Sequence, residues 1–187
     1  MEFKAFPKIP RLSREVVISE KIDGTNASIA IYDCQDPEAQ GNPYVVVHPE
    51  GYYIFAGSRN RWITPENDNY GFARWVVDHA EELVDMLGPG HHFGEWWGKG
   101  IQRGYNQIEK KFSLFNTAKW SDEAARPKCC GVVPVITHGE FTTDLVDIAL
   151  EQLRIKGSYA APGYPYPEGV VIFHVASNYL FRKTIED

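Results

Sequence analysis

Lys21 is the first residue of this sequence whose surroundings suggest chemistry. It lies in the polar segment Glu-Lys-Ile-Asp-Gly-Thr-Asn of residues 20–26, between the apolar runs 16–18 and 29–32. A lysine at the end of one strand and just before the next is either a solvated turn residue or a nucleophile, since an unprotonated lysine amine can form covalent intermediates. The short pattern Lys-x-Asp-Gly does not distinguish these alternatives, because chains of average composition contain it by chance.

Two carboxylates and a pair of cations occur at other predicted strand ends. Glu95 lies among aromatic residues and glycines, which can bring the backbone and the acid close to a ligand. Glu168 precedes an apolar strand, and Arg182 and Lys183 follow later in the sequence. Their structural alternatives are a tight turn with buried tryptophans, a solvated strand end and an exposed sheet edge. Their combination with Lys21, in this order, favours one catalytic site.

The composition is that of a folded globular chain. The length of 187 residues predicts a single domain, residues 1–187. A net charge of -6 has the wrong sign for a protein that coats nucleic acid non-specifically, although Lys99, Arg103, Lys110 and Lys111 could form a local basic groove. The three cysteines are odd in number and two are adjacent, which argues against a disulfide framework and predicts a cytoplasmic protein. No apolar stretch is long enough to cross a bilayer, so we expect no membrane partner.

Apolar spacing predicts an α+β fold in which antiparallel sheets are flanked by helices. Many strands follow one another in hairpin order, and two segments have helical spacing. Residues 1–14 contain prolines and basic residues, and we expect them to lie as a strap over the surface. The expected helices are 72–87 and 143–155, and the expected strands are 16–19, 27–32, 44–48, 52–55, 92–97, 112–115, 132–136, 169–175 and 179–183.

The order of these motifs resembles the adenylyltransferase domain of nucleic-acid ligases and messenger-RNA capping enzymes. Within that superfamily, the residues around Lys21 and the run 93–102 most resemble the RNA ligases that seal nicks in duplex RNA. The resemblance covers the chain from about residue 15 to the end and implies a ligase-type nucleotidyltransferase (adenylation) domain, without an OB-fold or a helical C-terminal domain. The segments that carry it are residues 20–26, 58–59, 93–95, 112–116, 168–171 and Lys183.

The resemblance implies an ATP-dependent ligase reaction. Lys21 would attack the α-phosphate of ATP and form a covalent lysyl-AMP, with Lys183 and bound Mg²⁺ (or Mn²⁺) favouring the unprotonated amine. Glu168 would support the metal, and Arg59 would meet the nucleotide phosphate or the incoming 5′-phosphate. The AMP would pass to the 5′-phosphate end of a nucleic acid, RNA in preference to DNA, and a 3′-hydroxyl would seal the strand, as in RNA repair.

The remaining implied roles concern nucleotide binding. Glu95 would hydrogen-bond the ribose hydroxyls, and Glu20, or the backbone beside it, would contact the adenine edge. Phe115 would stack on adenine, with Phe112 as the second candidate and core packing as the alternative for both. The expected set of cofactor-binding residues is completed by Asp23, Gly24 and Asn26.

The sequence departs from the family pattern in three places. Asn116 stands where an aspartate is more usual. Phe181 and Arg182 occupy the first two places of the usual Lys-x-Lys motif, so the efficiency of lysine adenylylation is in question. The sequence ends four residues after Lys183, and we therefore expect that a protein partner could replace the absent C-terminal domain.

Three other functions remain open from the sequence. The first is a DNA ligase or a GTP-dependent capping-type nucleotidyltransferase. The second is an adenylyltransferase with a protein or small-molecule acceptor, which the net acidity favours. The third is a nucleotide or nucleic-acid binding module without turnover, which the altered last motif favours. A P-loop is absent from the sequence, and neither Cys129–Cys130 nor His91–His92 has the spacing of a structural zinc site.

Overall fold

The computed structural model describes residues 1–186, in two compact units. Unit 1 contains residues 1–21 and those from Pro134 onward, and unit 2 contains Ile22–Val133. We describe each unit by itself. That residues 1–187 form a single domain stays a prediction.

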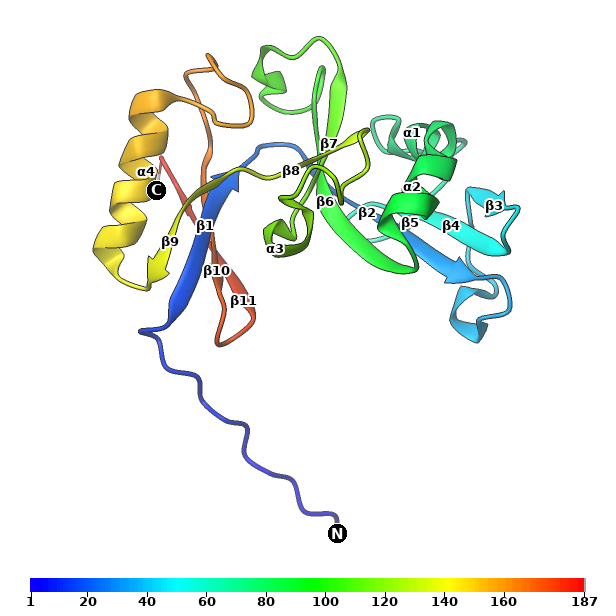
Figure 1. Cartoon of the computed structure of the whole chain (residues 1–187), viewed down its shortest axis with the longest axis horizontal. Helices are drawn as coiled ribbons and strands as arrows, with labels where there is room; N and C mark the ends of the chain where they lie inside the picture. Colours follow the sequence, from blue (N-terminus) through cyan, green and yellow to red (C-terminus); the bar gives the residue numbers. More distant parts are fainter. Residues whose placement is uncertain (187) are drawn as a thin grey trace. The chain divides into compact units, whose positions relative to one another are not determined.

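Unit 1 is a four-stranded antiparallel sheet with one helix (Figure 1). The strand order is β11-β10-β1-β9. Helix α4, Thr143–Lys156, begins where Thr142 Oγ1 accepts a hydrogen bond from Leu145 N at 3.0 Å and ends at Gly157, whose φ is 79°. The strands are β1 Glu15–Lys21, β9 Val135–Glu140, β10 Gly169–His174 and β11 Tyr179–Thr184.

Alternation along β1 gives its two faces different roles. Val16 and Ile18 are fully buried and pack with α4 residues such as Ala149 and Leu153. Because successive strand side chains point to opposite faces, Glu20 belongs to this α4 face and Lys21 to the other face. The strand therefore separates a buried acid from a lysine that can reach solvent.

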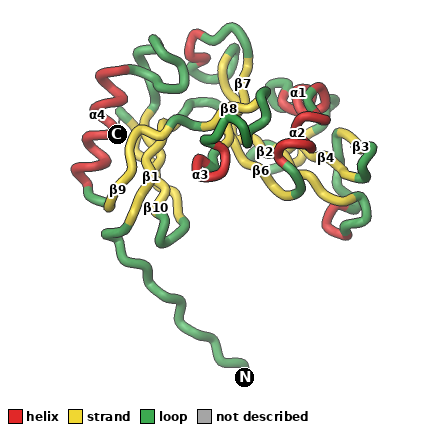
Figure 2. The backbone as a smooth tube through the Cα atoms, viewed as in Figure 1, coloured by secondary structure: helices red, strands yellow, loops and turns green. Residues whose placement is uncertain are grey.

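Unit 2 is built on a seven-stranded sheet, shown with its helices in Figure 2. The order is β3-β4-β2-β6-β7-β8, with β5 paired to β4, and the pairs are antiparallel except for the parallel pair β7–β8. The strands are β2 Thr25–Asp33, β3 Val46–His48, β4 Tyr52–Gly57, β5 Trp62–Ile63, β6 Gly90–Gly98, β7 Lys110–Leu114 and β8 Cys130–Val132. The helices are α1 Phe72–Asp78, α2 Ala80–Leu87 and α3 Thr117–Trp120, with short 3₁₀ turns η1 Pro37–Ala39 and η2 Gly104–Asn106.

The core of unit 2 lies on one face of this sheet. Ile29 and Trp96 from the strands pack in one cluster with Phe72, Val76 and Leu83 from α1 and α2. The opposite face carries a smaller buried cluster with Ala30 and Phe55, and also polar residues such as Asn26 and Glu95. Mixed α+β architecture with largely antiparallel sheets confirms the predicted fold class.

Two predicted elements are each divided in the structure. The segment 72–87 forms two helices instead of one, because His79 has φ −114° and ψ 14°, outside the helical region, and its ring Nδ1 lies 2.8 Å from Trp75 O. The segment 132–136 forms the end of β8 and the start of β9, because Pro134 between them has no N–H to donate to a ladder.

The first residues also differ from the prediction. Phe3, Phe6, Ile9 and Leu12 are between 65% and 91% exposed, so this segment does not pack as a strap on the surface. Among the described helices, none combines the length and the apolar character that crossing a membrane requires.

Candidate functional site

Lys21 and Glu168 form an ion pair at one end of the unit 1 sheet. Lys21 is the last residue of β1 and lies opposite Gly169 in β10, so the preceding Glu168 comes beside it. Lys21 Nζ donates to Glu168 Oε2 at 2.6 Å, and the two side chains are only 21% and 17% exposed. The carboxylate thus fixes the direction of the lysine side chain.

Glu20 is a buried anchor on the opposite face of β1. Its carboxylate accepts hydrogen bonds from Ser158 Oγ at 2.6 Å and from the backbone N–H groups of Tyr159 and Ala160 at 2.8 Å each. Burial raises the pKa of Glu20, and these three hydrogen bonds lower it by a smaller amount. The carboxylate thus holds the loop after α4, and the adenine contact at Glu20 or the backbone beside it stays a prediction.

Lys183 does not lie where the resemblance places it. It pairs with Val170 in β10, and Val170 pairs with Glu20, so all three side chains belong to the α4 face. There Lys183 Nζ donates to Asp147 Oδ1 at 2.6 Å. The structure therefore brings Lys183 together with α4 and separates it from the face that carries Lys21.

Arg182 is the cation on the Lys21 face. It pairs with Val171, which pairs with Ser19, two residues before Lys21 on β1. Phe181, like Lys183, belongs to the α4 face, so the missing first lysine of the expected motif would not have pointed toward Lys21. Arg182 was predicted from the sequence as one of two candidate cations, but its face was not, because the pairing register, which decides the face, is not written in the motif.

Gly169 explains how β11 approaches β10 at this point. A Cβ on Gly169 would collide with the backbone carbonyl oxygen of Lys183 and would lie 2.7 Å from Thr184 Cα. The sheet therefore requires glycine directly after Glu168.

In unit 2, Glu95 is held in a row of polar side chains. Asn26 on β2, Glu95 on β6 and Ser113 on β7 are register partners and share one face. Glu95 is 8% exposed. It accepts from Gly24 N at 3.1 Å and from Asn26 Nδ2 at 3.3 Å, while Arg59 Nε donates to Asn26 Oδ1 at 2.9 Å. Four of the predicted residues thus form one hydrogen-bonded chain.

Gly24 and Asp23 hold the turn before β2. A Cβ on Gly24 would lie 2.5 Å from Trp96 O and 2.7 Å from Trp97 Cβ, so only glycine fits there. Asp23 Oδ2 accepts from Arg103 Nε at 3.0 Å, and Asp23 N donates to the hydroxyl of Tyr105 at 2.7 Å. The sequence analysis missed Arg103 and Tyr105 in this role, because nothing in their spacing connects them with residue 23.

The two adenine-stacking candidates are separated by burial. Phe112 is fully buried in the core of unit 2, whereas Phe115 is 36% exposed just after β7. The neighbouring Asn116 caps α3 by accepting a hydrogen bond from Lys119 N at 3.1 Å. Phe115 is therefore the ring that can meet a ligand, and the unusual Asn116 has a structural role.

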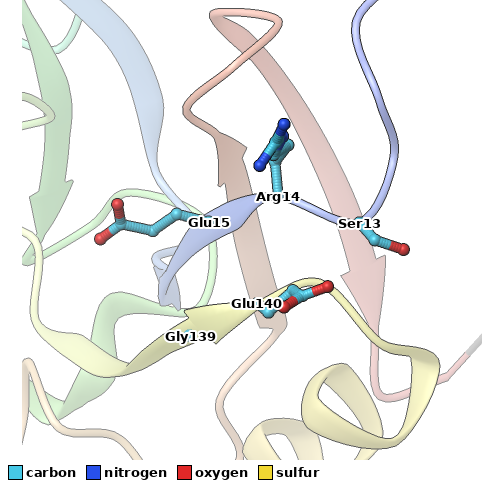
Figure 3. Close-up of a pocket in the computed structure, with 5 residues that line it drawn as sticks. All are labelled: Ser13, Arg14, Glu15, Gly139 and Glu140. Carbon is cyan, nitrogen blue, oxygen red and sulfur yellow. The ribbon is translucent and has the colours of Figure 1, made fainter.

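Two hollows in unit 1 lie away from Lys21. One of about 350 Å³ is lined by Ser13, Arg14, Glu15, Gly139 and Glu140, at the opposite end of β1 (Figure 3). The other, of about 370 Å³, includes Asp147 and Lys183 on the α4 face. None of the residues lining the first is a predicted site residue. Among residues 1–186, no group of three His, Cys, Asp or Glu side chains could hold a metal ion by itself.

Comparison with protein families decides the assignment. The model of a family described as RNA ligase matches residues 14–181. The chain belongs to the RNA ligase family. A comparison with curated proteins gave no match.

Solved structures similar to this RNA ligase-family chain include variants of Naegleria gruberi RNA ligase. An apo variant has a TM-score of 0.58 at 17% identity, and a variant with ATP and Mn has a TM-score of 0.61 at 14% identity. Another, with AMP and Mn, has a TM-score of 0.58 at 16% identity. Each match covers 92% of this chain and 50% of the other, so this chain spans about half the length of the chains it matches. At these identities the similarity shows the fold.

Proposed function

We propose that this chain is an ATP-dependent RNA ligase in which Lys21 becomes covalently adenylylated. The observation that carries the proposal is the Lys21–Glu168 ion pair at the end of β1, in a chain of the RNA ligase family. A solvated turn lysine would have no need of a partner 147 residues away. In the proposed reaction, the Nζ lone pair forms a bond to the α-phosphorus while the bond from that phosphorus to the pyrophosphate oxygen breaks, and the proton leaves Nζ.

The residues around Lys21 would orient it and balance charge. Glu168 accepts the hydrogen bond from Nζ and so aims the side chain, and Glu20 fixes β1 through residues 158–160. Arg182, on the Lys21 face, would take the cationic role that the resemblance gives to Lys183. Positive charge near a transferring phosphoryl group stabilises the transition state.

The polar chain of unit 2 would bind the nucleotide. Glu95 would accept from the ribose hydroxyls, and Phe115 would stack on adenine. Asn26, with Gly24 and Asp23 in the turn before it, would lie near the phosphates, and Arg59 would meet a phosphate.

A divalent cation, Mg²⁺ or Mn²⁺, fits the residues present. Glu168 offers one carboxylate, and nucleotide-bound Mg²⁺ takes one or two carboxylates with phosphates and water as its other ligands. The cation would supply charge to the triphosphate. The Naegleria gruberi structures with ATP and Mn support this cofactor pair. The proposed acceptor is RNA with 5′-phosphate and 3′-hydroxyl ends, and a protein partner and a cytoplasmic location stay predictions.

Incubation with α-labelled ATP and Mg²⁺, followed by a denaturing gel and mass spectrometry, tests the proposal. We expect an AMP adduct on Lys21 that is absent in Lys21→Ala and present in Lys128→Ala, an exposed lysine in unit 2. Parallel reactions with GTP, and then with nicked RNA and DNA duplexes, separate the capping-type and DNA-ligase alternatives. A folded protein without any adduct would favour a binding module, and an adduct without strand sealing would favour a different acceptor.

A further inference from the structure

Three rings stand side by side on one face of the unit 2 sheet. The ring centroids of Trp62 and His91 lie 5.6 Å apart with 18° between the planes, and those of His91 and Phe93 lie 4.5 Å apart with 22° between the planes. We call Trp62, His91 and Phe93 the ring stack. Near-parallel rings at such separations are a favourable arrangement.

Small residues beneath the ring stack explain why it can form. Trp62, Gly57, Ser28 and Phe93 are successive register partners, so they make one row on the same face. A Cβ on Gly57 would lie 3.4 Å from Trp62 Cζ3 and would collide with Ser28 Oγ. His91 Nε2 lies 3.4 Å from that same hydroxyl. The small residues Gly57 and Ser28 therefore leave room for the three rings on this face of the sheet.

The end of the ring stack at Phe93 is open to solvent. Phe93 is 56% exposed, although it lies within β6 between neighbouring strands. The same face carries Glu95 two residues further along β6, and the backbone N–H of the exposed Phe115 donates to Phe93 O at 3.0 Å. At the other end, Trp62 packs against the cluster that contains Phe55. The exposed ring of Phe93, beside a proposed nucleotide-binding carboxylate, is therefore the part of the ring stack that indicates a ligand-binding role.

The positive charge beside the ring stack favours binding of a polyanion. Arg59 is exposed and lies in the loop between β4 and β5, shortly before Trp62, and its Nε donates to Asn26 on the Glu95 face. Burial lowers the pKa of His91, so its ring is uncharged at neutral pH and stacks as a neutral aromatic. Aromatic faces for bases, with an arginine for phosphates, are the combination that binds single-stranded nucleic acid.

We propose that the ring stack is a base-stacking site for a single-stranded part of the RNA acceptor, with Phe93 as the ring that the base covers and Arg59 meeting the adjoining phosphate. The inference rests on the proposed function in taking RNA as the acceptor. In this inference, Phe93, His91 and Trp62 bind the RNA strand, and Phe115 stacks on the adenine of ATP.

Binding measurements with a matched pair of probes test the ring stack. The probes are a short fluorescent single-stranded RNA with a 5′-phosphate and an abasic phosphodiester strand of the same length. Phe93→Leu, which keeps an apolar side chain but removes the ring, should weaken binding of the RNA by roughly tenfold, because stacking of one base on an aromatic ring contributes about that factor or more. Binding of the abasic strand should not change, and Phe93→Tyr should restore RNA binding.

Tyr179→Leu is the control, because Tyr179 is a 64% exposed aromatic residue on the edge strand of unit 1. Equal RNA binding by Phe93→Leu and wild type, an equal loss with both probes, or no RNA binding by the wild type would overturn the inference. The label-transfer assay on the same proteins keeps the two proposals apart. Labelled protein without base-dependent binding removes only the ring-stack inference, and base-dependent binding without labelling removes only the ligase proposal.

Discussion

Lys183 Nζ lies 2.6 Å from Oδ1 of Asp147, and this ion pair connects strand β11 with helix α4. The pair lies on the face of β11 that the register with β10 turns toward α4. Since neighbouring residues on a strand point to opposite faces, Arg182 shares the face of Lys21. The cation that assists Lys21 is then expected one position earlier than the motif suggests.

Arg182→Ala should slow label transfer from ATP to Lys21 by roughly 100-fold, since it removes a cation from the developing phosphate charge. Lys183→Ala should leave the rate within about a factor of three, because an exposed ion pair contributes little. Initial rates of adduct formation check both variants, with Arg182→Lys as the conservative control. A larger loss in Lys183→Ala than in Arg182→Ala would restore the role that the resemblance gives to Lys183.

Glu168→Gln and Glu168→Ala should both reduce adduct formation by roughly 100-fold or more, because each removes the carboxylate that orients Lys21 and offers a metal ligand. The pair is part-buried and not at the core, so the fold should persist in both variants. Circular dichroism and label transfer measured on the same samples check this. Unfolding of both variants, instead of inactivation in folded protein, would indicate that Glu168 is structural.

Glu20→Ala should lower the free energy of unfolding by about 3 kcal/mol, because it leaves the buried Ser158 hydroxyl and two part-buried backbone N–H groups without their acceptor. Urea unfolding measures this change. The matched variant is Glu15→Ala at the exposed start of β1, which should have little effect. Equal changes in the two variants would contradict the anchoring role.

The stability difference between wild type and Glu20→Gln should depend on pH. Burial raises the pKa of Glu20 above 4.5, so the folded protein binds this proton more tightly than the unfolded chain. The contribution of the raised pKa of Glu20 to stability is fully present below pH 4.5 and is lost as the pH rises through the pKa of the folded protein. The free energy of unfolding of the wild type minus that of Glu20→Gln should therefore decrease as the pH rises over that window. Urea unfolding at a series of pH values checks the sign, and a difference that increases with pH would refute it.

Gly24→Ala should destabilise the turn before β2 by about 1–3 kcal/mol, since its Cβ would meet Trp96 O at 2.5 Å and the backbone would have to shift. The shift would also lengthen the hydrogen bond from Gly24 N to Glu95 Oε1, so the KM for ATP should increase. The matched control is Gly139→Ala, whose Cβ would meet only Leu145 Cδ2, at 3.4 Å. If Gly24→Ala keeps the stability and the KM of the wild type, the close approach of residue 24 to Trp96 O is not needed for either property.

Sequence patterns predicted the parts of the fold that rest on local chemistry. Apolar runs predicted β1 and β10, and helical spacing over 143–155 predicted α4, which spans Thr143–Lys156. The break at His79 was missed because the helical spacing of apolar residues continues across it. The break at Pro134 was missed because it lies inside one apolar run.

The candidate site was predictable as a set of residues but not as an arrangement. The motifs named Lys21, Glu168, Glu95 and Asn26, but they did not predict the contacts Lys21–Glu168 and Glu95–Asn26. The anchoring of Glu20 by residues 158–160, and the face of Arg182, depend on pairing between strands that are far apart in sequence. Long-range register is set by packing, which no short motif records.

The opposite directions of the Glu20 and Lys21 side chains favour the correct pairing register of β1. A slip by one residue would bring the lysine beside the N–H and O–H donors that now bind the Glu20 carboxylate, and would turn the acid toward the face of Lys21. Both errors raise the free energy of the slipped pairing in addition to the lost apolar contacts. These two adjacent residues therefore also discriminate against misfolded pairings, so the proposed nucleophile would reach its face in the same folding event that pairs the strands correctly.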